Sequence, residues 1–184
     1  MSRILILEGG LYGHLNHLYD NPDFDFATLK KIFNTASSGE LIGTEKVDGQ
    51  NLYLSYSVAE GVAKAARNKG NIKQGGLDAK GLAAKFADRG NLTRAFTEAF
   101  EAFENVANMM DPKTQAAIFG EDANIWYNAE IMDPLNMNIV KYSARLLTIH
   151  QQGHAEYDRE TGKVVDKDVS KNVQVLQGAV PNIG

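Results

Sequence analysis

The chain has 184 residues, no cysteine and a formal net charge of −4 at pH 7. This length without an internal repeat predicts one domain with a sizeable core, and the lack of cysteine excludes disulfides, thiolate catalysis and cysteine-based metal sites. No apolar run approaches the roughly 18 residues of a membrane span, and the first residues do not form a secretory signal. We therefore expect a cytoplasmic protein with no membrane partner. The negative net charge argues against a broad basic surface for nucleic acid.

Residues 1–40 are expected to form an irregular lead-in and a first helix. The stretch 9–22 is rich in glycine and turn-forming residues. Asp25 can cap a helix from Phe26 to about Thr35, because apolar residues recur at helical spacing there and Ser37-Ser38-Gly39 ends the pattern.

Residues 41–150 are expected to form the core of the domain. Alternating apolar and polar residues predict paired strands over 51–58 and 62–67, joined at Glu60-Gly61. Residues 71–76 are polar and contain glycine, which predicts a loop.

Two helices are predicted after that loop. Asp78 opens the first, Gly90-Asn91 interrupts it, and the second extends from Leu92 to about Met110. Asp111-Pro112 ends the second helix, because the residue before proline is disfavoured in a helix. Its apolar positions share one face and are expected in the core: Leu92, Phe96, Phe100, Phe103, Val106 and Met110.

Strands are expected again from Ile125 onward, and 151–184 are expected to form a hairpin and tail that turns at 158–162. Period two places Glu130 on the more polar face of the first of these strands, with Trp126 and Asn128. Paired strands with helices between them predict an α+β fold with antiparallel sheets and flanking helices, in a single domain over 1–184.

The segment Lys46-Val47-Asp48-Gly49, preceded by Thr44-Glu45, resembles the adenylation motif of ATP-dependent polynucleotide ligases, which implies a lysine that attacks the α-phosphate of ATP. An amine attacks phosphorus only when unprotonated, and free lysine has a pKa of about 10.4, so a reactive site must lower that pKa by burial or nearby cations. Asp48 would raise the lysine pKa if it paired with it directly. We therefore expect Asp48 to orient a turn or hold metal-bound water, while Gly49 permits a tight backbone near a phosphate.

This segment, with the residues that follow it in order, resembles the ATP-dependent polynucleotide ligases, most closely the RNA ligase branch. Ala66-Arg67-Asn68-Lys69-Gly70 is similar to the second ligase motif, and the strand that carries Glu130 is similar to the third. Asn138-Ile139-Val140-Lys141-Tyr142 and Leu146-Leu147 are similar to segments in which an aromatic ring stacks on adenine. The resemblance covers roughly 40–150.

The resemblance implies the ATP-grasp-like nucleotidyltransferase (adenylation) domain of DNA and RNA ligases, a lysyl-AMP intermediate, and ATP and Mg²⁺ as cofactors. It implies catalytic Lys46 and the nucleotide-binding residues Glu45, Asp48, Gly49, Asn51, Arg67, Glu130 and Tyr142. Glu130 is expected to bind ribose, Arg67 ribose and the incoming strand, and Tyr142 the base. Nucleic-acid ends are the expected partner, through a local basic patch of Lys64, Arg67, Lys69 and Lys73. A solvated hairpin edge is the alternative for that patch.

Two ligase motifs that bind the metal and the α-phosphate are not placed before Gly184. The chain is thus expected to be either the first part of a longer enzyme or a shortened relative that keeps a nucleotide pocket. His14-Leu15-Asn16-His17-Leu18 ahead of Lys46 also resembles proteins of tailed bacteriophages, which implies host cytoplasm and a different class: a virion or assembly protein that reuses a ligase-like fold without catalysis. A third alternative is a nucleotide or nucleic-acid binding module without a covalent step.

The sequence assigns no metal ligand. His14 and His17 have the spacing of two ligands on a helical turn but no third ligand near them, which favours a structural role. His150 and His154 have no base or nucleophile near them in the sequence and remain unassigned.

Overall fold

A computed structural model describes residues 22–41, 47–150, 154–166, 172–173, 175–176 and 182–183. Packing of the backbone divides the chain into two compact units, Met1–Val47 and Asp48–Gly184. The single nucleotidyltransferase-like domain expected over 1–184 stays a prediction. No helix among the described residues combines the length and the apolar character that a bilayer crossing requires.

The first unit contains α1 (Phe26–Ser37). The Asp25 carboxylate accepts a hydrogen bond of 2.7 Å from the backbone N–H of Thr28, which satisfies one of the donors that a helix start leaves unpaired. The predicted cap and start are confirmed, and the helix continues two residues beyond Thr35.

The second unit is built on an antiparallel sheet. Its path runs in the order β2-β1-β3-β4-β7, and a short branch carries β5, which pairs with β3, and β6. The bounds are β1 (Gln50–Ser57), β2 (Val62–Ala66), β3 (Ile125–Met132), β4 (Arg145–Ile149), β5 (Ala155–Tyr157), β6 (Val164–Asp166) and β7 (Asn182–Ile183).

Both predicted hairpins are confirmed. β1 and β2 pair from Ser57 with Val62 onward, close to the predicted strand ends. The turn between β5 and β6 is fixed by Asp158, whose N–H donates to the Lys163 carbonyl over 2.9 Å and whose carboxylate accepts from the N–H of Thr161 over 2.7 Å. Side chains of this kind that bind the backbone two or three residues on are typical of turns.

The helices of the second unit are α2 (Lys69–Lys73), α3 (Ala79–Lys85), α4 (Asn91–Asn108) and α5 (Pro112–Phe119). The two helices predicted after Asp78 and after Gly90 are confirmed, as is the break at Asp111-Pro112. The loop predicted for 71–76 is partly wrong, because the Asn68 side chain caps α2 and 71–73 are helical. α5, which Asp111 caps and Pro112 begins, was not predicted.

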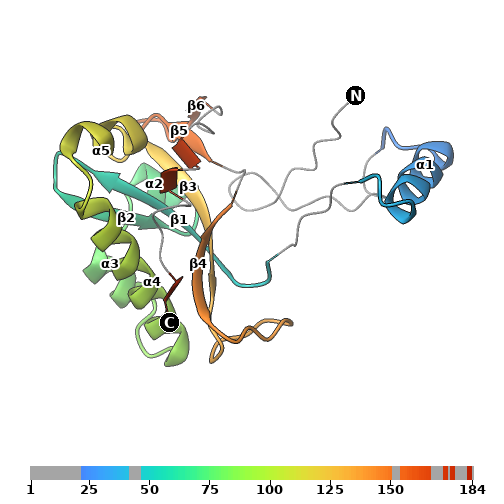
Figure 1. Cartoon of the computed structure of the whole chain (residues 1–184). Coiled ribbons are helices and arrows are strands. Elements are labelled where there is room, and N and C mark those ends of the chain that lie inside the picture. The colour runs from blue at the N-terminus through green and yellow to red at the C-terminus, as the bar shows by residue number, and fades with distance from the viewer. Residues whose placement is uncertain are drawn as a thin grey trace. The chain divides into compact units, whose positions relative to one another are not determined.

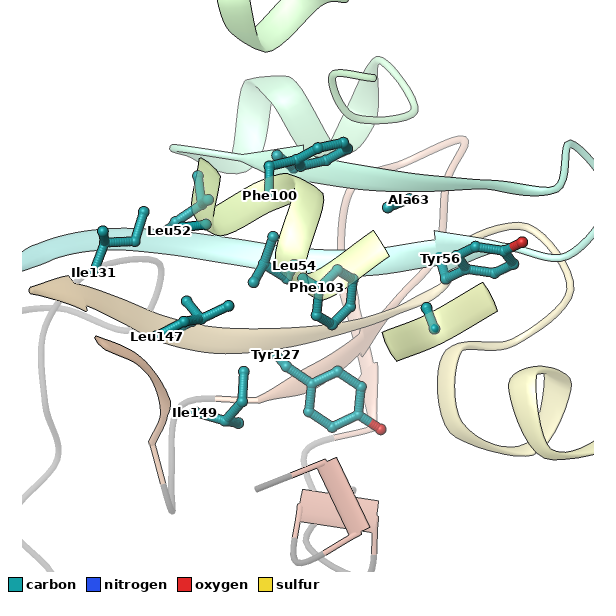
Figure 2. Packing of buried hydrophobic residues seen from close by; sticks show 14 of the residues in the cluster. Leu52, Leu54, Tyr56, Ala63, Phe100, Phe103, Tyr127, Ile131, Leu147 and Ile149 are labelled. Carbon is teal, nitrogen blue, oxygen red and sulfur yellow. The ribbon is translucent and has the colours of Figure 1, made fainter. Parts of the chain in front are cut away.

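The main hydrophobic core lies between the sheet and the helices α3, α4 and α5, which cover one face of it (Figure 1). Phe96, Phe100 and Phe103 of α4 are fully buried, as predicted. Figure 2 labels members of this cluster from β1 to β4 and from α4. The mixed composition, antiparallel sheet and flanking helices confirm the α+β class.

A buried carboxylate ties α4 to the end of β3. The side chain of Asp133 is 3% exposed and accepts two hydrogen bonds, of 3.0 and 2.8 Å, from Nη2 of Arg94 on α4. It also accepts the N–H of Leu135 over 2.7 Å. These contacts fix the start of the connection between β3 and β4, which carries several of the predicted site residues.

Candidate functional site

The candidate site lies where β1 begins beside the end of β3. Asp48 and Gly49 directly precede β1, and antiparallel pairing sets Gln50 against Ile131 and Asn51 against Glu130. Residues about eighty positions apart in the sequence are therefore neighbours. The pairing brings the segment that follows Lys46 to the strand that carries the predicted ribose-binding glutamate.

Gly49 is in direct contact with Glu130. Its backbone N–H donates to Oε1 of Glu130 over 2.9 Å. A Cβ added to Gly49 would lie 2.3 Å from the carbonyl oxygen of Ile131 and 2.9 Å from Cγ of Glu130. Glycine is thus required here by the close approach of β3, a reason that the sequence alone does not reveal.

The second oxygen of Glu130 faces a histidine. Nε2 of His150 lies 3.1 Å from Oε2 of Glu130, and the two side chains are 14% and 13% exposed. The N–H of His150 donates to the carbonyl of Asn128 over 3.0 Å, which continues the pairing of β4 with β3 beyond Ile149. No pattern in the sequence assigns His150 a role, and only the strand register brings it to Glu130.

Asp48 organises the connection between β3 and β4. Its Oδ2 accepts the N–H groups of Ile139 and Val140 over 2.6 and 2.9 Å. Its own N–H donates to the hydroxyl of Tyr142 over 2.8 Å. The carboxylate orients a loop, which is one of the two roles expected for it, and the structure brings Asp48 and Tyr142 together.

Asn138 adds a further link between this loop and the start of β1. Its Nδ2 donates to the carbonyl of Gly49 over 2.7 Å, and its Oδ1 accepts from Nε2 of Gln50 over 2.9 Å. Residues 138–142 form an irregular loop rather than a strand. The loop is nevertheless held to the segment 48–50 by several hydrogen bonds.

Asn51 and Arg67 lie together one step further along β1. Nδ2 of Asn51 donates to Oδ1 of Asn128 over 2.5 Å, and the Asn51 carbonyl accepts from Nη1 of Arg67. The Arg67 guanidinium carbon lies 5.1 Å from the ring centroid of Phe96 and 5.9 Å from that of Phe86. Burial lowers the pKa of Arg67. Arg67 is built into the edge of the core, and its guanidinium is engaged by protein groups.

The predicted basic patch needs a correction. The Lys64 residue is 8% exposed, and its Nζ lies 2.5 Å from Oε2 of Glu60. A buried and ion-paired lysine contributes no free charge to a surface, so Lys64 does not belong to the patch. Lys69 and Lys73 are exposed on α2, and Arg67 is half-buried.

A second histidine supports the first. His154 is buried, its Nδ1 accepts the N–H of Asn128 over 3.0 Å, and its Nε2 lies 2.7 Å from the carbonyl of His150. Nδ1 therefore lacks a proton and Nε2 carries one. Burial lowers the pKa of His154 to about 4, so this imidazole is neutral at pH 7.

The polar face of β3 is confirmed with one qualification. Tyr127, Ala129 and Ile131 belong to the core cluster, and Trp126, Asn128 and Glu130 alternate with them, as predicted. Trp126 is nevertheless 1% exposed, and within the described part of the chain its Nε1 has no hydrogen-bond partner. The face of β3 that carries Trp126, Asn128 and Glu130 is therefore polar but shielded from solvent at Trp126.

Four predicted residues lie outside the described part of the chain: Glu45, Lys46, His14 and His17. Their assigned roles stay predictions. Among the described residues, no group of three or more His, Asp or Glu side chains is placed to hold a metal ion. Comparison with protein-family models, with curated proteins and with solved structures found no match.

Proposed function

We propose that the chain is an ATP-dependent nucleotidyltransferase of the polynucleotide ligase type, in which Lys46 takes an adenylyl group from ATP. The observation that carries this proposal is the hydrogen bond of 2.9 Å between the Gly49 N–H and the Glu130 carboxylate. The resemblance predicts that the motif of Gly49 and the motif of Glu130 share one site. The hydrogen bond between these two residues is an observation that does not depend on the resemblance. Lys46 precedes Gly49 by three residues, a length of chain that spans at most about 11 Å.

The covalent step is a displacement at the α-phosphorus of ATP. The unprotonated amine of Lys46 forms a nitrogen–phosphorus bond while the bond to the bridging oxygen breaks, and the amine proton passes to solvent. Pyrophosphate leaves with the electron pair of the broken bond. Magnesium bound to the phosphates would neutralise the charge that develops on the leaving group, and magnesium commonly reaches such sites through substrate phosphates.

Glu130 is suited to bind a sugar hydroxyl. An ionised carboxylate offers about four acceptor positions, and among the described residues Gly49 and His150 each use one of them. The remaining positions can accept hydroxyl groups of a ribose. A clamped carboxylate loses little conformational freedom on binding, which favours affinity.

Tyr142 and Asp48 serve the same site in this proposal. The hydroxyl of Tyr142 is engaged by the Asp48 N–H, which fixes the ring, and stacking of this ring on a base is its role in the proposal. Arg67 has a structural contact in addition to the role that the resemblance implies. Because Nη1 of its guanidinium donates to the Asn51 carbonyl and the Phe96 ring lies beside it, it also holds β1 in place, and its further N–H donors stay assigned to the ribose and the incoming strand.

We further propose that the α+β fold of the second unit is that of a ligase adenylation domain, and that the substrates are nucleic-acid ends. Exposed Lys69 and Lys73 on α2 offer local positive charge for a phosphate backbone. A virion or assembly protein that keeps only the fold would need neither Glu130 nor Lys46 for its function. A measured catalytic activity therefore distinguishes this proposal from a virion or assembly role.

The test is transfer of label from ATP carrying a radioactive α-phosphate, with and without Mg²⁺, followed by denaturation. We expect label on the wild-type chain and none on Lys46→Arg, which keeps the charge but not a nucleophilic amine. Glu130→Gln is expected to lower labelling at least about tenfold, since it weakens charged hydrogen bonds. Glu101→Gln, at an exposed position of α4, makes the same charge change outside the site and should label like the wild type.

Three results would contradict the proposal. Label that persists on Lys46→Arg would place the nucleophile elsewhere. ATP binding without label would indicate a nucleotide-binding module, and neither binding nor label would favour a structural or assembly protein.

A further inference from the structure

We propose that His150 is a positioning residue for Glu130: it fixes the plane of the carboxylate and offsets part of its negative charge, so that Glu130 can bind a ligand hydroxyl close to anionic phosphates. This inference rests on the proposed function of the site. No sequence pattern assigns His150 this role.

The strand pairing delivers the imidazole to Glu130. Glu130 pairs with Thr148, and His150 is two residues further along the same edge, opposite Asn128. Residues two apart on a strand point to the same face, and diagonal neighbours on adjacent strands are within reach of long side chains. Nε2 of His150 reaches Oε2 of Glu130 at 3.1 Å, with both side chains largely withdrawn from solvent.

The backbone of His150 is held on both sides. Its N–H donates to the Asn128 carbonyl over 3.0 Å, and its own carbonyl accepts from Nε2 of His154 over 2.7 Å. Nδ1 of His154 in turn accepts the Asn128 N–H over 3.0 Å. The neutral His154 ring therefore links the end of β4 to β3 through two hydrogen bonds and adds no charge to the site.

Both carboxylate oxygens of Glu130 consequently have a protein partner. Gly49 donates to Oε1 over 2.9 Å, and Nε2 of His150 faces Oε2. Partners on two different oxygens restrict rotation of the carboxylate about its terminal bond, so the remaining acceptor positions point in fixed directions. Arg67 also interacts electrostatically with Glu130, and these partners reduce the repulsion that a carboxylate exerts on a nearby phosphate.

The test compares two amide substitutions at position 150. Gln places an N–H donor near the position of Nε2, whereas the shorter Asn does not reach Oε2. We expect His150→Asn and His150→Ala to raise the ATP concentration for half-maximal labelling by about tenfold or more, the effect of losing one hydrogen bond to a charged group. We expect His150→Gln to stay within about threefold of the wild type.

A second arm tests whether the effect passes through Glu130. In the Glu130→Gln background, His150→Asn should change the half-maximal ATP concentration by less than about twofold, because the interaction it removes is already gone. Thermal unfolding followed by circular dichroism identifies variants that lose the fold. Long-range proton–nitrogen NMR should show a proton on Nε2 of His150 in the wild-type chain.

The outcomes separate the two proposals. If the wild type labels and His150→Asn labels at the same ATP concentration, the role of His150 is refuted while the proposed function stands. Equal losses in Gln and Asn would also refute it, since a purely structural role makes no distinction between the amides. If the wild type neither labels nor binds ATP, the proposed function fails and this inference fails with it.

Discussion

Replacing Gly49 with alanine tests the contact on which the site depends. The new Cβ would lie 2.3 Å from the Ile131 carbonyl oxygen and 2.9 Å from Cγ of Glu130, so β1 and β3 must separate locally. Overpacking of this kind costs about 1–3 kcal/mol. Separation also breaks the hydrogen bond of the Gly49 N–H to Glu130, a bond to a charged group that contributes about 1.5–3 kcal/mol.

The two effects together predict that Gly49→Ala lowers the free energy of unfolding by roughly 2.5–6 kcal/mol. Urea unfolding followed by circular dichroism measures this change directly, and the thermal midpoint should fall by about 10 °C. Gly61→Ala is the matched control. Gly61 has a φ of +68° and open space where a Cβ would stand, so alanine there meets only backbone strain of about 1–2 kcal/mol.

Equal destabilisation by the two alanines would refute the close approach of β3 at Gly49. Both variants add one methyl group to a glycine near a strand end of the same sheet; the methyl group meets another strand only at Gly49, and at Gly61 its cost is backbone strain alone. Loss of label transfer in Gly49→Ala with unchanged stability would instead place the glycine in ligand binding, as the sequence analysis expected.

Three further predictions concern buried ionisable groups. Burial lowers the pKa of His154 from its ordinary value of 6.5 to about 4, so between these two pH values only the unfolded state gains a proton. The free energy of unfolding therefore has its full value above pH 6.5 and falls by about 3 kcal/mol by pH 4. Urea titrations of His154→Gln should show a flatter pH dependence. Asp133→Asn should cost about 1.5–3 kcal/mol, because Arg94 loses its charge-assisted hydrogen bonds to the buried carboxylate but keeps its ion pair with Glu98, whereas Asp88→Asn at an exposed position should cost less than about 0.5 kcal/mol in the same assay. Burial raises the pKa of Tyr127, so its phenol should not ionise in an alkaline absorbance titration until the protein unfolds.

Local chemistry made much of the fold predictable. Asp25 and Asp78 were recognised as helix caps because a short carboxylate satisfies the first backbone donors of a helix, and the alternation in 51–58 marked a strand with distinct faces. α5 was missed because Asp111-Pro112 was interpreted only as a stop. The same dipeptide provides a cap and a proline at the first helical position, which together also start a helix.

The residues of the candidate site were likewise predictable only in part. The order of motifs along the chain pointed to Asp48, Gly49, Glu130 and Tyr142, and these residues do lie together. His150 could not be found by that route, because its contact depends on the register between two strands joined by an irregular loop. A register that sets Glu130 against Thr148 would have been the signal, and no local pattern in the sequence determines it.

Trp126 gives this protein an optical reporter of its own. It is the only tryptophan in the chain, it is 1% exposed, and it lies on the face of β3 that also carries Glu130. The emission of a buried indole is shifted to the blue and moves to the red when water reaches the ring. Intrinsic fluorescence excited at the red edge of protein absorption therefore follows the integrity of this one face of the sheet, without any attached dye.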